Sequence, residues 1–187
     1  MNKLNKAIAV LKKGGVIIVP TDTVYGFIAD ATSKKAVEKI YKIKKRPKSK
    51  PLPVFVSGLK MVRELAEIDV HQEKVLKKYW PGAYTFVLKR KAPDVGRRVL
   101  FGQDKNTIAL RIPKHAFLQK LLKKINRPLV QTSVNISTQE PLNSKEQIIA
   151  TFSKNHLVGL IIDGGVAKNA KPSKIIDLTS KKLTRLR

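Results

Sequence analysis

The sequence contains no cysteine among its 187 residues. This absence excludes a thiolate nucleophile, a zinc ion held by cysteine and any disulfide bond. It is also compatible with the reducing cytosol, where disulfides rarely persist. The function classes that remain are those whose chemistry requires no thiol.

Long hydrophobic runs are also absent. No stretch approaches the roughly 20 apolar residues that a membrane-spanning helix requires. The start of the chain is basic and then apolar, as in a signal peptide, but Ala7–Leu11 supplies only five apolar residues before Lys12, and no small-residue cleavage site follows. We therefore expect a soluble cytoplasmic protein with no membrane contact.

Several motifs of known chemistry are missing from the chain. There is no G-x-x-x-x-G-K-[ST] loop, and the two Gly-Gly pairs lack the G-x-G-x-x-G pattern. A G-x-S-x-G elbow is absent as well, which disfavours a serine hydrolase of that type. His71, His115 and His156 have no metal-ligand spacing and are each expected to be surface side chains. We expect no dedicated metal site.

Acidic residues are scarce, with 13 Asp and Glu against 39 Lys and Arg, and the formal net charge is +26. Such an excess attracts nucleic acid, anionic membranes or phosphorylated ligands. The lysines are nevertheless spread along the whole chain, as a lysine-biased proteome would produce. Charge alone therefore leaves the partner open.

The hydrophobic pattern predicts alternating strands and helices. We expect helices over residues 4–11, 33–44, 59–66, 70–79, 116–125 and 144–152, and strands over 16–19, 52–56, 84–88, 108–112, 129–132, 157–162, 175–178 and 183–186. Pro53 suggests that its strand lies at an edge or contains a bulge. With no linker or repeat, residues 1–187 are predicted to form one α/β domain, a twisted mixed sheet flanked by helices.

Polar clusters follow three of these strands or helices. Thr21, Asp22 and Thr23 come directly after the strand 16–19, at a position where α/β sheets often bind ligands, although an ordinary turn would use the same residues. Ser133 and Asn135 follow the strand 129–132 and could donate hydrogen bonds to a phosphate or carboxylate. A turn that only caps this strand is an equal alternative.

A cationic loop, Lys44–Lys50, begins where the helix 33–44 ends. Its cations repel one another unless an anion joins them, and prolines at 47 and 51 restrict the backbone. An arginine fork together with lysine charges suits a triphosphate. A solvated helix C-terminus is the competing interpretation.

In order and spacing these clusters resemble the YrdC family, the threonylcarbamoyl-AMP synthases. The resemblance covers nearly the whole chain and rests on seven landmarks: Pro20-Thr-Asp-Thr-Val-Tyr-Gly26, Lys44-x-Arg46-Pro, Lys50-Pro-Leu, Trp80-Pro-Gly-x-Tyr-Thr85, Arg111-x-Pro113, Ser133-x-Asn135 and Pro172-Ser-x-Ile-Ile-Asp177. Each landmark alone is weak, whereas seven in register are specific.

The resemblance implies condensation of L-threonine, bicarbonate and ATP to threonylcarbamoyl-AMP and pyrophosphate, for N6-threonylcarbamoyladenosine in tRNA. It also implies a nucleotide site and a threonine site. The nucleotide site would comprise Lys44, Arg46, Lys50, Thr107, Asn135 and Arg185, with Lys44 and Arg46 acting on the phosphates in catalysis. The threonine site would comprise Thr23, Arg111, Ser133 and Ser173. Mg²⁺ is expected to arrive with ATP, bound mainly through phosphates and water.

Departures from the family pattern are few. Val134 stands in place of a small alanine, Lys174 in place of a frequent threonine, and Phe55 where some relatives carry a polar residue near threonine. Two alternatives remain: a YciO-like paralogue, which shares the fold, and an RNA-binding module that uses the basic surface without catalysis. The resemblance also implies the tRNA-modification machinery as a downstream partner, with direct RNA contact through the basic surface left open.

Overall fold

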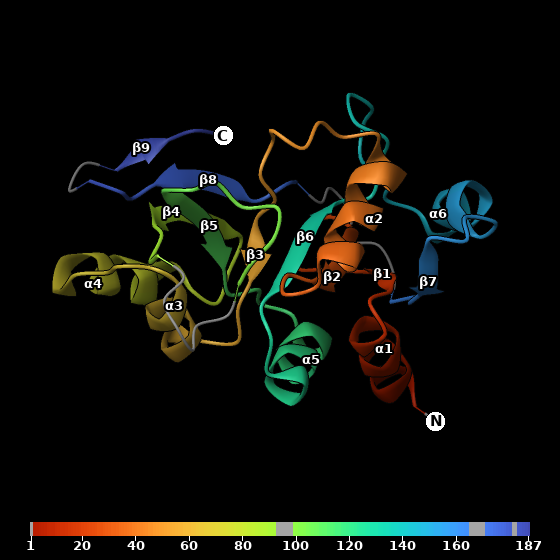
Figure 1. Ribbon diagram of the computed structural model, residues 1–187, viewed down its shortest axis with the longest axis horizontal. Coiled ribbons are helices and arrows are strands. Elements are labelled where there is room, and N and C mark those ends of the chain that lie inside the picture. Colours follow the sequence, from red (N-terminus) through yellow and green to blue (C-terminus); the bar gives the residue numbers. More distant parts are fainter. Residues whose placement is uncertain (1, 93–98, 165–170, 181–182) are drawn as a thin grey trace.

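The structure is a computed structural model, and it describes residues 2–92, 99–164, 171–180 and 183–187. Its centre is a nine-stranded mixed sheet with the strand order β7-β1-β2-β6-β3-β5-β4-β8-β9 (Figure 1). The strands are β1 (Val16–Val19), β2 (Gly26–Asp30), β3 (Val54–Phe55), β4 (Tyr84–Lys89), β5 (Thr107–Arg111), β6 (Leu129–Ser133), β7 (Val158–Ile161), β8 (Lys174–Asp177) and β9 (Thr184–Arg185). The α/β class and the mixed sheet are as predicted.

Helices cover both faces of the sheet: α1 (Lys3–Lys12), α2 (Lys34–Lys44), α3 (Leu59–Leu65), α4 (Val70–Tyr79), α5 (Ala116–Ile125) and α6 (Lys145–Phe152). Their ends follow local chemistry. Ser33 and Ser144 accept backbone hydrogen bonds at the starts of α2 and α6, and Asp69 forms a reciprocal capping box with Gln72 at the start of α4. The expected helix boundaries agree with these to within one residue.

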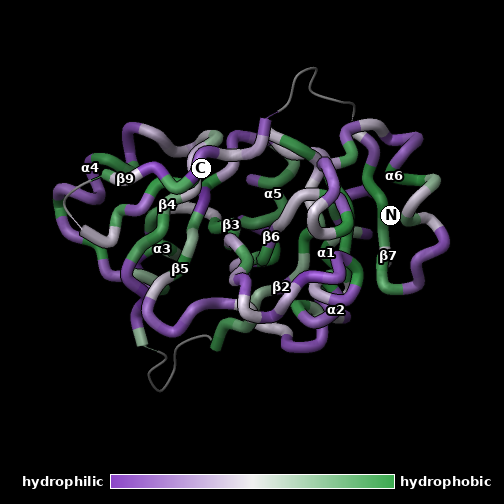
Figure 2. The backbone as a smooth tube through the Cα atoms, turned by 90° about the horizontal axis from the view of Figure 1, so that it is seen from above, coloured by the Kyte–Doolittle hydropathy of each residue, from purple (hydrophilic) through white to green (hydrophobic). Residues whose placement is uncertain are grey.

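Alternate residues of the central strands enter two separate hydrophobic cores. In β1, Val16 and Ile18 join the core beneath α2, α3, α4 and α6, whereas Ile17 and Val19 join the core beneath α1 and α5. This alternation is the two-residue period of a strand that is buried on both faces. Hydrophobic segments accordingly run through the middle of the molecule, and hydrophilic ones lie mostly at its periphery (Figure 2).

Two strand predictions were incomplete. Strand β2 was not predicted, because its residues Gly26–Asp30 begin at the last residue of the Pro20–Gly26 motif and end on a buried aspartate. The expected strand 52–56 is only Val54–Phe55, and it lies inside the sheet between β5 and β6 rather than at an edge. Pro53 is tolerated there because it precedes the paired residues, and its carbonyl accepts the Gln131 N–H.

The face that carries α1 and α5 is covered over only part of the sheet. Gln131 and Ser133 continue the same face of β6 as Leu129, which packs in the core under α1 and α5. Instead of packing under a helix, both residues line an open cleft. Because α1 and α5 cover only the part of this face near Leu129, the polar residues Gln131 and Ser133 remain accessible. Among the described helices, none combines the length and apolar character needed to cross a bilayer.

An ion pair between the buried Asp30 and the half-exposed Arg127 joins the end of β2 to the segment after α5. Asp30 is 1% exposed, and it accepts hydrogen bonds from the Thr32 backbone and hydroxyl at 2.8 and 2.7 Å and from Arg127 at 2.6 Å. We predict that Asp30→Ala lowers the free energy of unfolding by about 2–4 kcal/mol, because it leaves these donors unpaired. Urea denaturation measures this change.

The matched control is Glu67→Ala, which breaks the exposed Lys89–Glu67 pair. Exposed pairs contribute about 0–1 kcal/mol, so this variant should remain within about 0.5 kcal/mol of wild type. Equal losses in the two variants would contradict the importance assigned to burial.

Candidate active site

A cleft of about 660 Å³ lies over the central strands, on the part of the sheet face that α1 and α5 leave open, and its volume is within the range of ligand pockets. It brings together segments from most of the chain. Its lining consists of Thr23, Val24, Lys44, Lys45, Arg46, Pro47, Lys50, Pro51, Pro53, Val87, Ala109, Arg111, Gln131, Thr132, Ser133, Ile136, Ser137, Thr138, Pro172, Ser173, Ile175 and Arg187. Every one of these side chains is neutral or cationic, so the cleft suits an anionic ligand.

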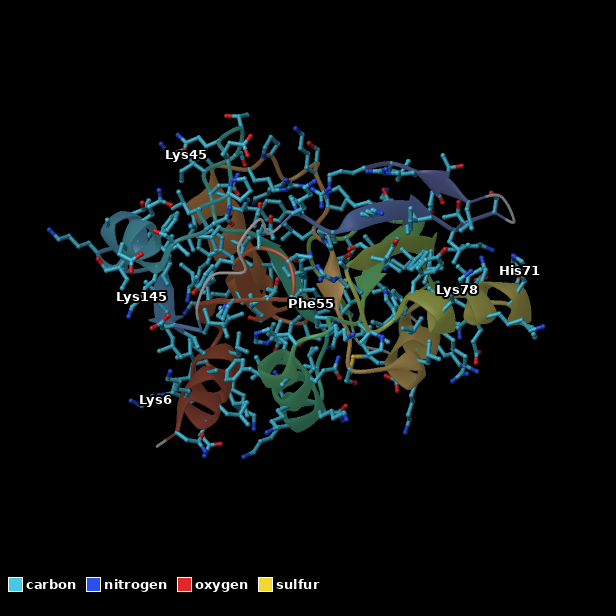
Figure 3. All side chains as sticks on the ribbon, turned by 180° about the vertical axis from the view of Figure 1, so that it is seen from behind. Lys6, Lys45, Phe55, His71, Lys78 and Lys145 are labelled. Atoms are coloured by element: carbon cyan, nitrogen blue, oxygen red, sulfur yellow. The ribbon has the colours of Figure 1, made fainter. Side chains whose placement is uncertain are left out.

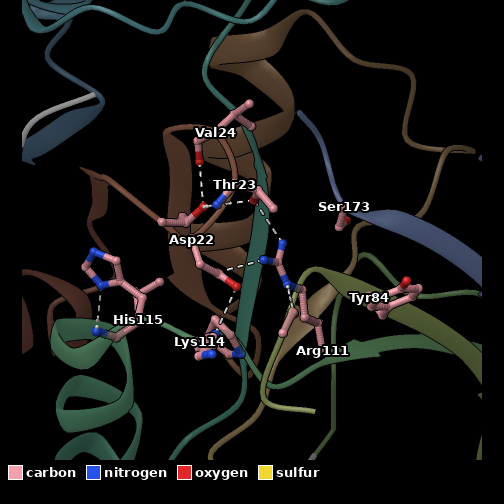
Figure 4. A network of polar contacts seen from close by, with 12 residues as sticks. Asp22, Thr23, Val24, Tyr84, Arg111, Lys114, His115 and Ser173 are labelled. Atoms are coloured by element: carbon pink, nitrogen blue, oxygen red, sulfur yellow. Dashed lines mark hydrogen bonds and ion pairs between the residues drawn. The ribbon is translucent and has the colours of Figure 1, made fainter. Parts of the chain in front are cut away.

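Arg111, the last residue of β5, is the buried centre of one end of the cleft (Figure 4). Its Nε donates to the Gly82 carbonyl at 2.9 Å and its Nη1 donates to the Thr23 hydroxyl at 3.0 Å. Its Nη2 lies 2.7 Å from Asp22 Oδ1 as an ion pair. Burial lowers the pKa of the guanidinium, and Asp22 opposes that shift. Two of the three nitrogens donate hydrogen bonds, and the third contacts Asp22 as an ion pair without hydrogen-bond geometry, so the charge is balanced inside the protein.

Asp22 also reaches the element beyond β5. Its Oδ2 accepts the Lys114 backbone N–H at 3.0 Å, and His115, which begins α5, lies next to it (Figure 4). His115 was expected at the surface, but it is half-buried and its Nδ1 accepts the Leu118 N–H. Burial lowers the pKa of this imidazole and Asp22 opposes the shift. The side chain serves as a helix cap.

Lys44, the last residue of α2, is buried at the opposite end of the cleft. Its Nζ donates to the Ser133 carbonyl at 2.8 Å, to the Asn135 carbonyl at 2.9 Å and to Asn135 Oδ1 at 2.7 Å. An ammonium has three N–H donors, so all of them are engaged. Lys44 therefore holds the Ser133–Asn135 turn onto α2, rather than presenting a free N–H to the cleft.

The side chains of Ser133 and Asn135 are joined by a hydrogen bond, although β6 ends at Ser133 and Asn135 lies in the turn beyond it. The Ser133 hydroxyl donates to Asn135 Oδ1 at 2.7 Å, and Asn135 Nδ2 donates to the Gln139 carbonyl. The Lys44 and Ser133 donors identify the Asn135 oxygen, and the Gln139 acceptor identifies its nitrogen. Here the Ser133 proton is directed to Asn135, so its oxygen is left to accept from a ligand.

Two arginines on the rim of the cleft are each anchored along one edge. Arg46 Nε and Nη2 donate to the carbonyls of Lys50 and Pro51, and Arg187 Nε and Nη2 donate to the Ser173 carbonyl. Within the described part of the chain, the hydrogen bonds of both guanidiniums come from Nε and Nη2, and none comes from Nη1. Burial, and next the proximity of Arg46, lower the pKa of Arg187. Two neighbouring cations without a carboxylate in the cleft form a site for an anion.

Most residues of the predicted site lie together. Thr23, Lys44, Arg46, Lys50, Arg111, Ser133 and Ser173 all line the cleft, and Asn135 contacts two of them. Thr107 and Arg185 do not line it. The Thr107 hydroxyl donates to Asp104, two residues along β5 from the lining residue Ala109, and Arg185 lies in a separate apolar pocket with Tyr79, Tyr84 and Phe86.

Phe55 lies under the site rather than in it. Its ring is fully buried in the core beneath α1 and α5, inside the sheet (Figure 3). The Arg111 guanidinium carbon is 5.5 Å from the ring centroid, close enough for a cation–π contact. The phenyl ring therefore packs against the Arg111 guanidinium, at the position where some relatives carry a polar residue.

Six polar residues that line the cleft were not among the predicted site residues: Lys45, Gln131, Thr132, Ser137, Thr138 and Arg187. Arg187 stands two residues beyond the predicted Arg185. Residues two apart in a strand project from the same face, so the alternation of side chains does not distinguish these two arginines. Ser137 lies two residues after Asn135, and its buried hydroxyl oxygen has no hydrogen-bond partner within the described part of the chain. The spacing Ser133, Asn135, Ser137 was the available signal. A buried hydroxyl of this kind is satisfied when a ligand or water reaches it.

Burial, followed by Arg46, lowers the pKa of Lys44 from 10.5 to about 8. Because the folded-state pKa is the lower one, the unfolded chain binds more protons between pH 8 and 10.5, and stability contributed at this position rises with pH. We predict that the unfolding free energy of wild type relative to Lys44→Met increases by on the order of 1–2 kcal/mol from pH 7 to pH 9.5.

Denaturant titrations at several pH values measure this difference. The control is Lys42→Met, on the exposed side of the same helix, which should show no such rise relative to wild type. A wild-type to Lys44→Met difference that stays level across the window would show that Lys44 is not desolvated in the folded state.

Comparisons with known proteins agree with this geometry. The sequence profile of a family described as Sua5_yciO_yrdC, telomere recombination, matches residues 9–187. A threonylcarbamoyl-AMP synthase of Buchnera aphidicola is 34% identical over 188 residues, which cover 99% of this chain and 96% of the relative.

Solved structures share the fold as well. The crystal structure of Pyrococcus abyssi Sua5 complexed with L-threonine superposes with a TM-score of 0.87 at 33% identity, covering 99% of this chain and 53% of that one. The structure of Escherichia coli YciO has a TM-score of 0.85 at 30% identity and covers 98% and 87% of the two chains. This chain spans about half the length of the Pyrococcus protein. The profile match and the near full-length identity establish that the chain belongs to the Sua5/YciO/YrdC family.

Proposed function

We propose that this protein is a threonylcarbamoyl-AMP synthase, which condenses L-threonine, bicarbonate and ATP and releases pyrophosphate. The observation that carries the proposal is a single cleft with two chemically different ends. Arg46, Lys50 and Arg187 form a cationic rim, whereas Thr23, Arg111 and Ser173 form a more enclosed polar end. The synthase names of full-length relatives and the threonine complex of the Pyrococcus protein support the same reaction.

The rim is the pyrophosphate side of the reaction. Arg46 and Arg187 are held by backbone carbonyls, so their charges are oriented before a ligand arrives. Preorganised cations stabilise charge that develops on a leaving pyrophosphate without reorganising during the reaction. Lys44 contributes indirectly, by fixing the turn that carries Ser133 and Asn135. Asn135 uses one of its two N–H donors on the Gln139 carbonyl, so the other is left for the nucleotide end.

The enclosed end receives threonine. Thr23 and Ser173 present hydroxyls there, and Arg111 fixes the Thr23 hydroxyl through a hydrogen bond from its Nη1. The threonine amine forms a C–N bond to the bicarbonate carbon, with net loss of water, and gives a carbamate. A carbamate oxygen then bonds to the α-phosphate as the bond to pyrophosphate breaks. Both steps depend on positioning and charge neutralisation, and neither requires a protein nucleophile. A chain without cysteine can perform them.

Mg²⁺ enters this proposal with ATP. The cleft lining contains no acidic residue, and no cluster of three or more carboxylates and histidines occurs among the described residues. The donor set therefore suits phosphate-bound magnesium, which would shield the triphosphate charge. The product would pass to the enzymes that transfer the threonylcarbamoyl group to tRNA, and the +26 net charge would attract the RNA.

The test incubates the purified protein with ATP, Mg²⁺, bicarbonate and L-threonine and follows pyrophosphate release. We predict release that requires both threonine and bicarbonate. Arg46→Ala should lower kcat/KM for ATP by about 30- to 1000-fold, because an oriented charge at the transition state is lost. Arg46→Lys should recover part of this, and Lys124→Ala on α5 should match wild type.

Release that ignores threonine would refute the synthase proposal. An inactive protein that binds RNA with a steep salt dependence would favour the binding-module alternative. An inactive protein that binds nucleotide alone would favour a YciO-like activity.

Arg187 and Arg185 form a matched pair for locating the nucleotide. Arg187 lines the cleft and Arg185, two residues earlier, lies in the aromatic pocket beside β9. Steady-state kinetics with varied ATP should show at least a tenfold loss of kcat/KM for Arg187→Ala and less than a twofold change for Arg185→Ala. The reverse order would mean that the C-terminal strand shifts its register when ATP binds.

A further inference from the structure

Two buried threonines stand behind the hydroxyls of the threonine end. Thr21 Oγ1 is 3.0 Å from Thr23 Oγ1, and Thr85 Oγ1 is 3.0 Å from Ser173 Oγ. Thr23 and Ser173 line the cleft, whereas Thr21 and Thr85 do not. A hydroxyl has one proton and two lone pairs, so the direction of each of these bonds decides what the exposed partner can offer a ligand.

The contacts of Thr21 determine the first direction. Its hydroxyl donates to the Val24 carbonyl at 2.7 Å and accepts the Thr23 backbone N–H at 3.0 Å (Figure 4). Having used its proton, it can only accept from the Thr23 hydroxyl. Thr23 therefore donates inward, while its oxygen accepts Arg111 Nη1. What Thr23 has left for the cleft is a lone pair, and no proton.

Burial determines the second direction. Thr85 is 0% exposed, and Ser173 Oγ is the only partner of its hydroxyl among the described contacts. A buried hydroxyl that does not donate loses the hydrogen bond it had to water, which costs more than an unused lone pair. Thr85 therefore donates to Ser173, and the Ser173 proton remains available. Ser173, 5% exposed at the cleft, is a donor.

We infer that Thr21 and Thr85 are positioning residues that set the hydrogen-bonding polarity of the threonine end, making Thr23 an acceptor and Ser173 a donor. An amino acid complements this pattern: its amine supplies an N–H to Thr23, and a carboxylate or hydroxyl oxygen accepts from Ser173. The arrangement orients the amine by its proton, which leaves its lone pair to point elsewhere for attack on the carbonate carbon. This inference rests on the proposed function and extends it to two residues that do not touch the cleft.

The test is a double-mutant cycle between Thr85 and Ser173, read out by calorimetric binding of L-threonine and by steady-state kinetics. Thr85→Val retains shape and removes the hydroxyl. It should weaken L-threonine binding about 3- to 10-fold, the effect of one net hydrogen bond, and leave KM for ATP within about twofold. Thr85→Ser should restore binding. In a Ser173→Ala background, Thr85→Val should add less than about twofold, because it acts through Ser173.

Multiplicative effects of Thr85→Val and Ser173→Ala, or an equal loss for ATP and threonine, would overturn the inference by showing a general structural role. Thr85→Ala provides a second hydroxyl-free variant if the valine variant does not fold. Thr21→Val against Thr21→Ser, in the presence and absence of Thr23→Val, repeats the cycle at the other hydroxyl. Wild-type protein that binds no L-threonine would refute the proposed function itself, which separates the two failures.

Discussion

The buried guanidinium of Arg111 is the interaction on which the cleft depends. It links three segments that are distant in sequence: the loop after β1 through Asp22 and Thr23, the turn before β4 through the Gly82 carbonyl, and β5 itself. A buried cation is stable only when its charge and donors are satisfied. The requirement works in both directions, because satisfying Arg111 also determines where Thr23 must lie. Phe55, packed beneath the guanidinium, completes this support.

The cations of the site divide into two kinds. Lys44 and Arg111 are buried, have partners on every nitrogen and shape the walls of the cleft. Arg46 and Arg187 are anchored along one edge and lie on the rim. The sequence does not reveal this division, because lysine and arginine residues of both kinds have the same residue type. The difference lies in burial and in the acceptors that the fold brings within reach.

Much of the architecture could be predicted from the sequence, because periodicity and caps are local. Ser33, Ser144 and the β-branched run Val16–Val19 each behave as their type and spacing require. Strand β2 escaped prediction because its pairing with β1 and β6 is what defines it. The central position of β3 follows likewise from tertiary contacts rather than from Pro53.

In the site, too, local sequence signals predicted some residues and long-range contacts determined the others. Position in a motif correctly gathered Thr23, Arg111, Ser133 and Ser173 at one cleft. It could not distinguish Arg187 from Arg185, since two residues of register in a terminal strand depend on long-range pairing with β8. It also assigned Lys44 to the phosphates, although three carbonyl acceptors from a segment 89 to 91 residues away occupy its ammonium. The acceptors of a buried ammonium depend on which distant segments the fold brings together.

Strand β3 has a mechanical consequence for the cleft. It joins two half-sheets, β7-β1-β2-β6 on one side and β5-β4-β8-β9 on the other, and it pairs with each through only two residues. Each end of the cleft takes residues from both halves: Arg46 and Arg187 meet at the rim, and Thr23 and Arg111 meet at the enclosed end. With so narrow a backbone seam, the bonds from Arg111 to Asp22 and Thr23 act as cross-ties between the halves. The spacing of the two half-sheets across the cleft is therefore set by side chains as much as by the sheet.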